Sequence, residues 1–593
     1  MRRLLTWVLA CSVAAGFAPV PMHSLGASSG SLSSAAARTS PNDLMAVMLR
    51  ELNRATASLA KSDPAPYFLS YAVSDIDTVG IVAANGGLVV STGMTMRRGD
   101  VMMRVGSVAL DNTHSHSRGS GITSGTLPLD NDPDAAARIL WELTNREYQQ
   151  AAASFAKVKA NNAVEAAEED KSPDFSQESP QKHTDLAQFR SFQGQKAWEE
   201  RVRKLSASFL NNPQVYTAMV SFTVSSDRSY LATSEGTSLI RPSAVARLVI
   251  QAEARADDGT ELMRVESFQA ATPEQLPADA EIAAKVNQMS VDLTNLRAAP
   301  AAEPYAGPAL LSGRAAAVFF HEVLGHRLEG HRQRDETQGQ TFTKKINQLV
   351  LPAFLSVTDD PTLKELDGVR LAGYYDYDDE GVPAARVIAV ENGVLKNFLM
   401  SRMPITNFSQ SNGHGRRQPG LMATGRQGNL IVTSSHTVKD AELRKQFVEE
   451  IKKQGKTYGL YFDDIQGGFT LTGRASPQAF QVLPVMVYRV YADGRPDELV
   501  RGVDIVGTPL LSLNNIMVTG DTMHVFNGIC GAESGQVPVS AAAPAMLFSE
   551  IEVQKRKRGT DRPPLLPPPG TGAASGPAPA SAPAKQPTSA VKP

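Results

Sequence analysis

Apolar and polar positions follow two different spacings along the chain. After Ser40-Pro41, a typical helix start, one helix face is marked by Leu44, Met45, Met48, Leu49, Leu52 and Leu59. Further on, strand-like runs flank Asn85-Gly86, a pair that suits a tight turn with positive φ. The same hairpin pattern surrounds Asn392-Gly393 and Asp493-Gly494. The patterning therefore predicts helices and antiparallel strands in one chain.

A short alanine- and proline-rich segment, residues 298–308, is predicted to be a linker between two domains. Residues 40–297 are predicted to form an N-terminal α+β domain with a helical and polar insertion near 135–211. After its first helix, the segment 309–556 is dominated by strand-like runs, and it is predicted to be a β-rich domain that carries a metal-site helix. The expected fold class is α+β with two domains.

Both ends of the chain differ from this folded part. Arg2 and Arg3 precede an uncharged run from Leu4 to Ala18, which is shorter than the roughly 20 residues of a bilayer span. This pattern is typical of an export signal, approximately residues 1–27, and predicts a periplasmic or secreted protein. At the other end, residues 561–593 are rich in proline and alanine and are predicted to be a disordered tail.

Composition excludes several classes of function. The chain has 593 residues, with 59 Lys and Arg against 61 Asp and Glu, so its formal net charge is -2. This balance gives no broad attraction to nucleic acid or to an anionic membrane. Cys11 and Cys530 are the only cysteines, which excludes disulfide scaffolds, iron–sulfur clusters and all-cysteine zinc ribbons. Chemistry must come from other residues, or from one thiol combined with them.

The segment from Ser312 to Arg334 carries the strongest chemical signal. A predicted helix contains His321, Glu322 and His326 in the order His-Glu-x-x-x-His, one residue longer than the zinc-protease pattern His-Glu-x-x-His. At about 100° per residue, a regular α-helix would place the two imidazoles about 140° apart. We therefore expect a deformed helix at Gly325, with a π-type turn that brings both rings to one side.

Two imidazoles leave a catalytic zinc ion short of a third protein ligand. Cys530, in a glycine-containing segment near the end of the folded part, is the first candidate because thiolate and imidazole both suit zinc. Glu329, His331 and His414 remain alternatives that rank below it. Glu322 is the candidate catalytic carboxylate.

Three blocks resemble the TldD/PmbA family of metallopeptidases, specifically its TldD-like branch that carries the histidine motif. They are FFHEVLGHRLEGH from Phe319, YYDYDDEGVPAARVIAVENGVLKNFLMSR from Tyr374, and GICGAESGQVPVS from Gly528. The resemblance implies Zn2+ held by His321, His326 and Cys530, with Glu322 as catalytic glutamate. It also implies pairing with a PmbA/TldE-like subunit that lacks the motif, and small or unfolded peptides as substrates. An export signal is not typical of the family's cytosolic members.

The predicted function is therefore zinc-dependent hydrolysis of unfolded or small peptides, with Glu322 as general base. The expected partners are a peptide substrate and either a second copy of this chain or a PmbA/TldE-like subunit, without nucleic acid and without a membrane beyond export. The alternative is a non-catalytic exported protein that binds peptides or supports assembly and has a structural metal site.

Overall fold

A computed structural model describes most of the chain between the two predicted terminal segments. The described residues are 41–114, 121–130, 132–162, 170–187, 192–474 and 479–556, together with 563 and 566. The predicted export signal, residues 1–27, and almost all of the predicted tail, residues 561–593, lie outside this part of the chain.

The first large sheet is built mainly from long antiparallel strands, whose side chains point alternately to its two faces. Its order is β3-β2-β1-β6-β7-β5, with β4 beside β2 and β8 beside β7, and only β5 runs parallel to its neighbour. The strands are β1 (Pro66–Ala84), β2 (Gly87–Ser107), β3 (Leu110–Asp111), β4 (Ile122–Thr126), β5 (Lys182–Thr184), β6 (Thr217–Thr233), β7 (Ser238–Arg255) and β8 (Glu261–Ala270).

Helices cover this sheet at its two ends. The helices α2 (Pro41–Leu59) and α3 (Pro133–Asn162) share a core with one end, and α4 (Gln195–Ala207) and α5 (Asp279–Ala298) share another core with the other end. In the second core, Val220, Phe222, Leu248 and Ile250 point toward α4 and α5. Because side chains alternate along a strand, the residues between them face the opposite side of the sheet.

The second large sheet contains a closed ring of strands. Its path β14-β13-β10-β17-β23-β21-β19-β18-β9 returns to β23, because β9 pairs with both β18 and β23. Off this path, β20 pairs with β19 and β22 pairs with β23. The strands are β9 (Tyr305–Leu311), β10 (Leu355–Asp359), β13 (Val387–Glu391), β14 (Val394–Leu395), β17 (Asn429–Ser434), β18 (Tyr458–Thr470), β19 (Phe480–Tyr491), β20 (Glu498–Val500), β21 (Val503–Gly507), β22 (Ile516–Ala532) and β23 (Gly535–Lys555).

Short elements complete this half. They are α6 (Gly313–Val323), α7 (His331–Arg334), α8 (Asp440–Lys453) and α9 (Pro509–Asn514), the strand pair β11 (Glu365–Leu366) and β12 (Val369–Arg370), and the pair β15 (Gly415–Arg416) and β16 (Thr424–Gly425). The residues Ala315–Phe320 of α6 are buried in the core of the second sheet. This packing fixes the position of the helix that was predicted to carry the histidines.

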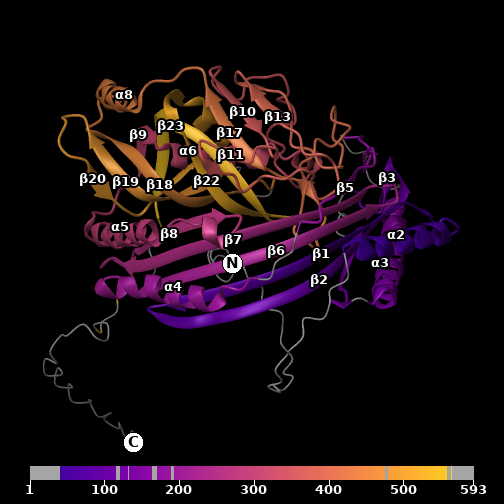
Figure 1. Ribbon diagram of the computed structural model, residues 1–593. Coiled ribbons are helices and arrows are strands. Elements are labelled where there is room, and N and C mark those ends of the chain that lie inside the picture. Colours follow the sequence, from indigo (N-terminus) through magenta and orange to yellow (C-terminus); the bar gives the residue numbers. More distant parts are fainter. Residues whose placement is uncertain are drawn as a thin grey trace, which may run out of the picture.

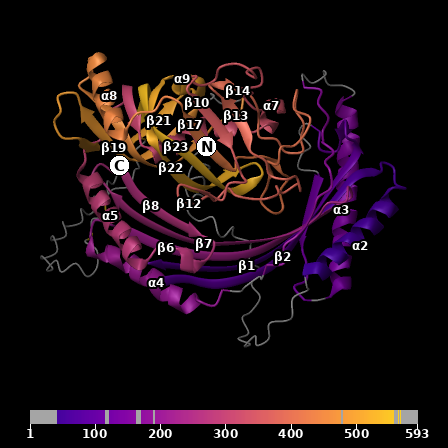
Figure 2. The same ribbon diagram turned by 45° about the horizontal axis from the view of Figure 1, so that its top comes forward.

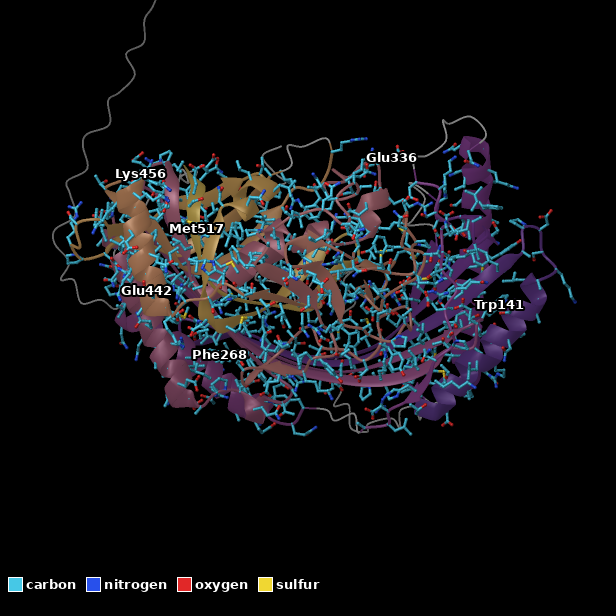
Figure 3. The ribbon with its side chains drawn as sticks, turned by 90° about the horizontal axis from the view of Figure 1, so that it is seen from above. Trp141, Phe268, Glu336, Glu442, Lys456 and Met517 are labelled. Atoms are coloured by element: carbon cyan, nitrogen blue, oxygen red, sulfur yellow. The ribbon has the colours of Figure 1, made fainter. Side chains whose placement is uncertain are left out.

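The two sheets lie against each other (Figures 1 and 2). The first sheet curves beneath the second, so that one of its faces looks toward α6 and the β18, β22 and β23 strands. Seen from above, Trp141 of α3 and Glu442 of α8 lie at opposite ends of the molecule (Figure 3). The functional candidates lie between the sheets rather than on the outer surface.

The predicted turns match the observed ones, and the predicted linker does not match in full. Asn85 and Gly86 both have positive φ, at 49° and 82°, and join β1 to β2; Asn392 and Gly393 join β13 to β14 in the same way. By contrast, β9 begins at Tyr305, inside the segment predicted to be a linker. Its Pro308 lies where the β9–β23 register shifts between Phe548 and Ile551, a position that tolerates proline.

Candidate functional site

The helix α6 is fixed at its start by a capped turn. The Ser312 hydroxyl accepts a hydrogen bond from the Ala315 amide at 3.1 Å, which satisfies one of the unpaired donors of the first turn. The same hydroxyl donates to the Asp463 carbonyl of β18 at 2.7 Å. The cap therefore joins the start of α6 to the strand beside it, and the buried helix carries His321 and Glu322 in its last turn.

The helix deforms where the sequence predicted, but the deformation is of another kind. The α-helix ends at Val323, Leu324 has φ of -107°, and residues 325–327 form a 3₁₀ turn in which the Arg327 amide donates to the Leu324 carbonyl at 2.8 Å. The expected π-type turn is therefore wrong. The tighter turn nonetheless brings the rings of His321 and His326 to a centroid distance of 5.0 Å.

A glycine is needed at position 325 because the Gln427 side chain lies close to it, and not because the backbone there has an unusual φ. A Cβ atom at this position would lie 1.9 Å from the Gln427 Oε1 atom. The Gln427 amide in turn donates to the His321 carbonyl at 3.4 Å. The Arg327 guanidinium donates to the carbonyls of Glu322 and Val323 at 3.2 and 3.1 Å, so it satisfies carbonyl groups in the last turn of the buried helix.

The structure brings Cys530 to the two histidines from a distant part of the sequence. Cys530 lies on β22, opposite Val537 of β23, and its Sγ atom is 3.4 Å from the His326 Nε2 atom. One ligand atom from each of His321, His326 and Cys530 lies within 4.8 Å of the other two, and all three residues are buried. The predicted donors thus form one cluster, and metal binding by them stays a prediction.

The three alternative ligands lie elsewhere in the hydrogen-bond network. Glu329 accepts from the His326 Nδ1 atom at 3.1 Å, so it holds a predicted ligand rather than joining the cluster. His331 contacts the Glu533 carboxylate through Nε2. His414 is fully buried, with its Nε2 atom 3.3 Å from an Asp359 carboxylate oxygen.

Sequence reasoning missed the role of Glu329 as a positioning group. Its carboxylate also accepts from the Arg332 Nε atom at 2.7 Å, and the Arg426 Nε atom lies 3.4 Å away. Burial opposes ionisation of Glu329, but His326 and the two arginines prevail and lower its pKa to about 2. The sequence spacing could have indicated these contacts, because Glu329 follows His326 by three residues and Arg332 follows Glu329 by three.

The charges within the cluster favour a thiolate. Burial raises the pKa of Cys530, but the imidazoles of His326 and His321 outweigh it and hold the thiol pKa well below its usual value. The pKa of Glu322 is raised, chiefly because burial disfavours its charged form. The Glu322 carboxylate lies 3.9 Å from the His326 Nε2 atom, which is beyond hydrogen-bond distance. It is therefore near the donor cluster and available to handle a proton.

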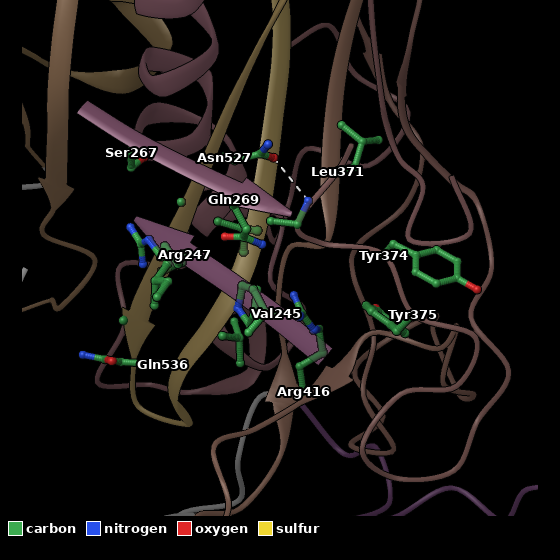
Figure 4. Close-up of a pocket in the computed structure, with 18 of the residues that line it drawn as sticks. Val245, Arg247, Ser267, Gln269, Leu371, Tyr374, Tyr375, Arg416, Asn527 and Gln536 are labelled. Carbon is green, nitrogen blue, oxygen red and sulfur yellow. Dashed lines mark hydrogen bonds between the residues drawn. The ribbon is translucent and has the colours of Figure 1, made fainter. Parts of the chain in front are cut away.

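A cavity of about 1800 Å³ opens beside this cluster. One wall is the first sheet, and the other consists of α6, β18, the β22–β23 hairpin and the segment 370–379. Figure 4 shows Val245, Arg247, Ser267 and Gln269 on two neighbouring strands, and Tyr374 and Tyr375 across the space from them. The Asn527 side chain accepts from the Ala372 amide at 3.2 Å and connects β22 to that segment (Figure 4).

Asp464 joins the two walls close to the cluster. Its carboxylate accepts from Arg264 of β8 at 2.7 Å and from Arg314 of α6 at 3.0 Å. Beyond Phe462, β18 pairs with β19 alone, so the other edge of residues 464–470 is unpaired in the described part of the chain. Gly468 lies on this edge against Glu322, and a Cβ atom there would be 2.8 Å from the Glu322 Cγ atom.

The sequence of the C-terminal part of the chain matches a known family. Residues 305–555 match the PmbA/TldA metallopeptidase C-terminal domain. This region of the chain belongs to the TldD/PmbA family.

Several metalloproteases are similar to part of this chain. A "Metalloprotease" of Archaeoglobus fulgidus is 30% identical over 268 residues, which cover 45% of this chain and 57% of that protein. A "Zinc metalloprotease TldD homolog" of Saccharolobus solfataricus is 29% identical over 255 residues, which cover 42% and 52%. The chain thus spans about half the length of the curated relatives it matches.

Similarity of fold extends beyond this region. The crystal structure of TldE from Thermococcus kodakarensis superposes with a TM-score of 0.56 over 86% of this chain and 100% of that one, at 13% identity. At this identity the likeness concerns the fold alone. It shows that the first sheet, as well as the second, has its counterpart in a solved structure.

The expected signal peptide and periplasmic location are corrected. Both rested on residues 1–27, which lie outside the described residues, and an apolar run after two arginines is a compositional signal alone. Neither the family match nor the named relatives support export, which also sits poorly with this family. Within the described residues, no helix combines the length and the hydropathy needed to cross a bilayer.

Proposed function

We propose that the chain is a zinc-dependent peptidase whose metal is held by His321, His326 and Cys530. The observation that carries the proposal is the convergence of these three buried donors beside Glu322 on the wall of a large cavity. The donor set fits the metal, because imidazole and thiolate are the ligands that zinc prefers. On this proposal the two sheets mark two domains, residues 40–297 and 309–556, and α6 is the metal-site helix of the second.

A bound zinc ion supplies Lewis-acid polarisation of a peptide carbonyl and of an attacking water molecule. Glu322 takes the proton of that water and returns it to the leaving amine. Its position suits this role, because no hydrogen bond within the described residues ties up its carboxylate and because burial raises its pKa. Glu329 holds the Nδ1 side of His326, which leaves the Nε2 atom directed at the cluster.

The proposed substrates are unfolded or small peptides. The unpaired edge of β18 over residues 464–470 offers backbone groups to an extended chain beside Glu322. Phe469, which is 41% exposed, provides apolar contact at the same edge. A folded domain of 100 residues has a radius of gyration of about 13 Å, too large for a cavity of this volume.

We further propose that the chain assembles with a TldE/PmbA-like subunit or with a second copy of itself. The fold likeness to TldE supports a partner of the same architecture. Light scattering of the purified chain, alone and mixed with such a subunit, distinguishes the two assemblies.

The proposal is tested by comparing Glu322→Gln with His321→Ala in zinc content and in cleavage of an unstructured peptide library. We expect Glu322→Gln to retain zinc and to lose cleavage, whereas His321→Ala loses both. Normal cleavage by Glu322→Gln would show that the general base is assigned wrongly. A non-catalytic protein with a structural metal is not favoured, because structural zinc takes four protein ligands and the described residues offer a group of three.

A further inference from the structure

Arg247 lines the cavity without a carboxylate partner among the described residues, unlike most of the other arginines there. Most of those are paired with carboxylates: Arg264 and Arg314 with Asp464, Arg332 with Glu533, and Arg417 with Asp100. In the described part of the chain, no carboxylate pairs with the Arg247 guanidinium. Burial lowers its pKa, and no neighbouring negative charge offsets that effect. A partly desolvated cation without a counter-charge is costly, so this position favours an anion.

The surroundings of Arg247 form a shallow polar patch on the first sheet. In the strand register, Arg247 of β7 lies opposite Thr223 of β6 on one side and Gln269 of β8 on the other. All three residues line the cavity, as does Ser267. Figure 4 shows Arg247 with Ser267 and Gln269 on the wall. The patch offers hydrogen-bonding groups around one positive charge, and its uncharged neighbours do not compete for that charge.

Arg247 is well separated along the first sheet from Arg264, the residue that donates to Asp464 across the cavity. Arg264, which donates a hydrogen bond to the Asp464 carboxylate, is opposite Ala252 of β7. Ala252 is five residues beyond Arg247 on that strand. At about 3.4 Å per residue, the backbone positions of Arg247 and Arg264 are therefore roughly 17 Å apart along the strands. An extended peptide of about five residues covers such a length. A peptide in the cavity can thus reach both places at once.

We infer that Arg247 binds a carboxylate of the peptide substrate and so selects peptides that carry a negative charge away from the scissile bond. The inference rests on the proposed peptidase function. The carboxylate comes either from the C-terminus of the peptide or from an Asp or Glu side chain. A guanidinium suits both sources, because it forms paired hydrogen bonds with a carboxylate.

The test uses the full chain and matched peptides of about ten residues, which extend over up to roughly 33 Å. One pair differs by a free or an amidated C-terminus, and a second pair differs by Asp or Asn at one internal position. Binding is measured by fluorescence anisotropy in the Glu322→Gln background, and kcat/KM is measured with Glu322 intact. We expect the charged member of one pair to bind about ten- to a hundred-fold more tightly, the range of a charge-assisted hydrogen bond.

Arg247→Gln should make the two members of that pair bind equally, and Arg247→Lys should restore part of the preference. The control is Arg370→Gln, which removes the same charge from another residue of the cavity lining and should leave the preference in place. An unchanged preference in Arg247→Gln, or no preference in the parent chain, overturns the inference. If the charge preference in binding is seen but no peptide is cleaved, the proposed peptidase function fails and the carboxylate site stands.

Discussion

The contact between Gly468 and Glu322 gives a sharp test of the general base. In Gly468→Ala, the added Cβ atom would lie 2.8 Å from the Glu322 Cγ atom and 3.0 Å from the Gln481 carbonyl oxygen. Carbon atoms in favourable contact are about 3.5 to 4.0 Å apart, so the Glu322 side chain must move by about 1 Å. A misplacement of this size costs about a hundred-fold in rate. We expect kcat on an unstructured peptide to fall by about that factor.

Gly467→Ala is the matched control, because a Cβ atom there meets no heavy atom within 4 Å. Both variants add one methyl group to the same strand, so effects on strand stability are shared. Metal analysis should find the same zinc content in both, since neither residue contacts the three donors. If Gly468→Ala cleaves as fast as Gly467→Ala while both remain folded by circular dichroism, Glu322 does not act from its observed position.

Three further outcomes follow from the same geometry. Cys530→Ser should lose most of its zinc, measured by metal analysis after dialysis; full retention would exclude the thiol as a ligand. Glu329→Gln should weaken zinc affinity about ten- to a hundred-fold, because His326 loses its orienting partner; an unchanged zinc titration would contradict that role. Burial raises the pKa of Glu147 to about 8, above its ordinary 4.5, although its carboxylate accepts from Thr123. The folded state therefore holds a proton that the unfolded state releases, and between about pH 5 and 8 the free energy of unfolding should fall by about 1.4 kcal/mol per pH unit. In Glu147→Gln, the free energy of unfolding measured by urea titration should depend less on pH over this range. A pH dependence that persists in this variant would show that another group causes it.

Local features were the most predictable from the sequence. Turns at Asn85-Gly86 and Asn392-Gly393 depend on two residues that tolerate positive φ, so their chemistry is visible in the chain. The start of α6 at Ser312 is likewise a local capping signal. The closeness of Cys530 to the histidines was predictable from the number of ligands that zinc needs, because two imidazoles leave a zinc site incomplete.

Features that depend on distant contacts were not predictable. The pairing of β9 with β23 joins segments more than 200 residues apart, and it converts part of an expected linker into a strand. The 3₁₀ turn lies beside Gln427, a residue distant in the sequence that fills the space next to Gly325. The cavity forms only because two sheets face each other. The residues around Arg247 in the sequence therefore do not indicate that Arg247 lines a cavity.

The shared carboxylate of Asp464 has a mechanical consequence. Arg264 belongs to the first sheet and Arg314 to the helix that bears His321, so the Asp464 side chain connects both walls of the cavity. Separating the walls at that point would rupture the Arg264–Asp464 ion pair, because Arg314 and Asp464 belong to the same wall. The relative position of the two sheets is thus fixed at this point by a side-chain contact between them.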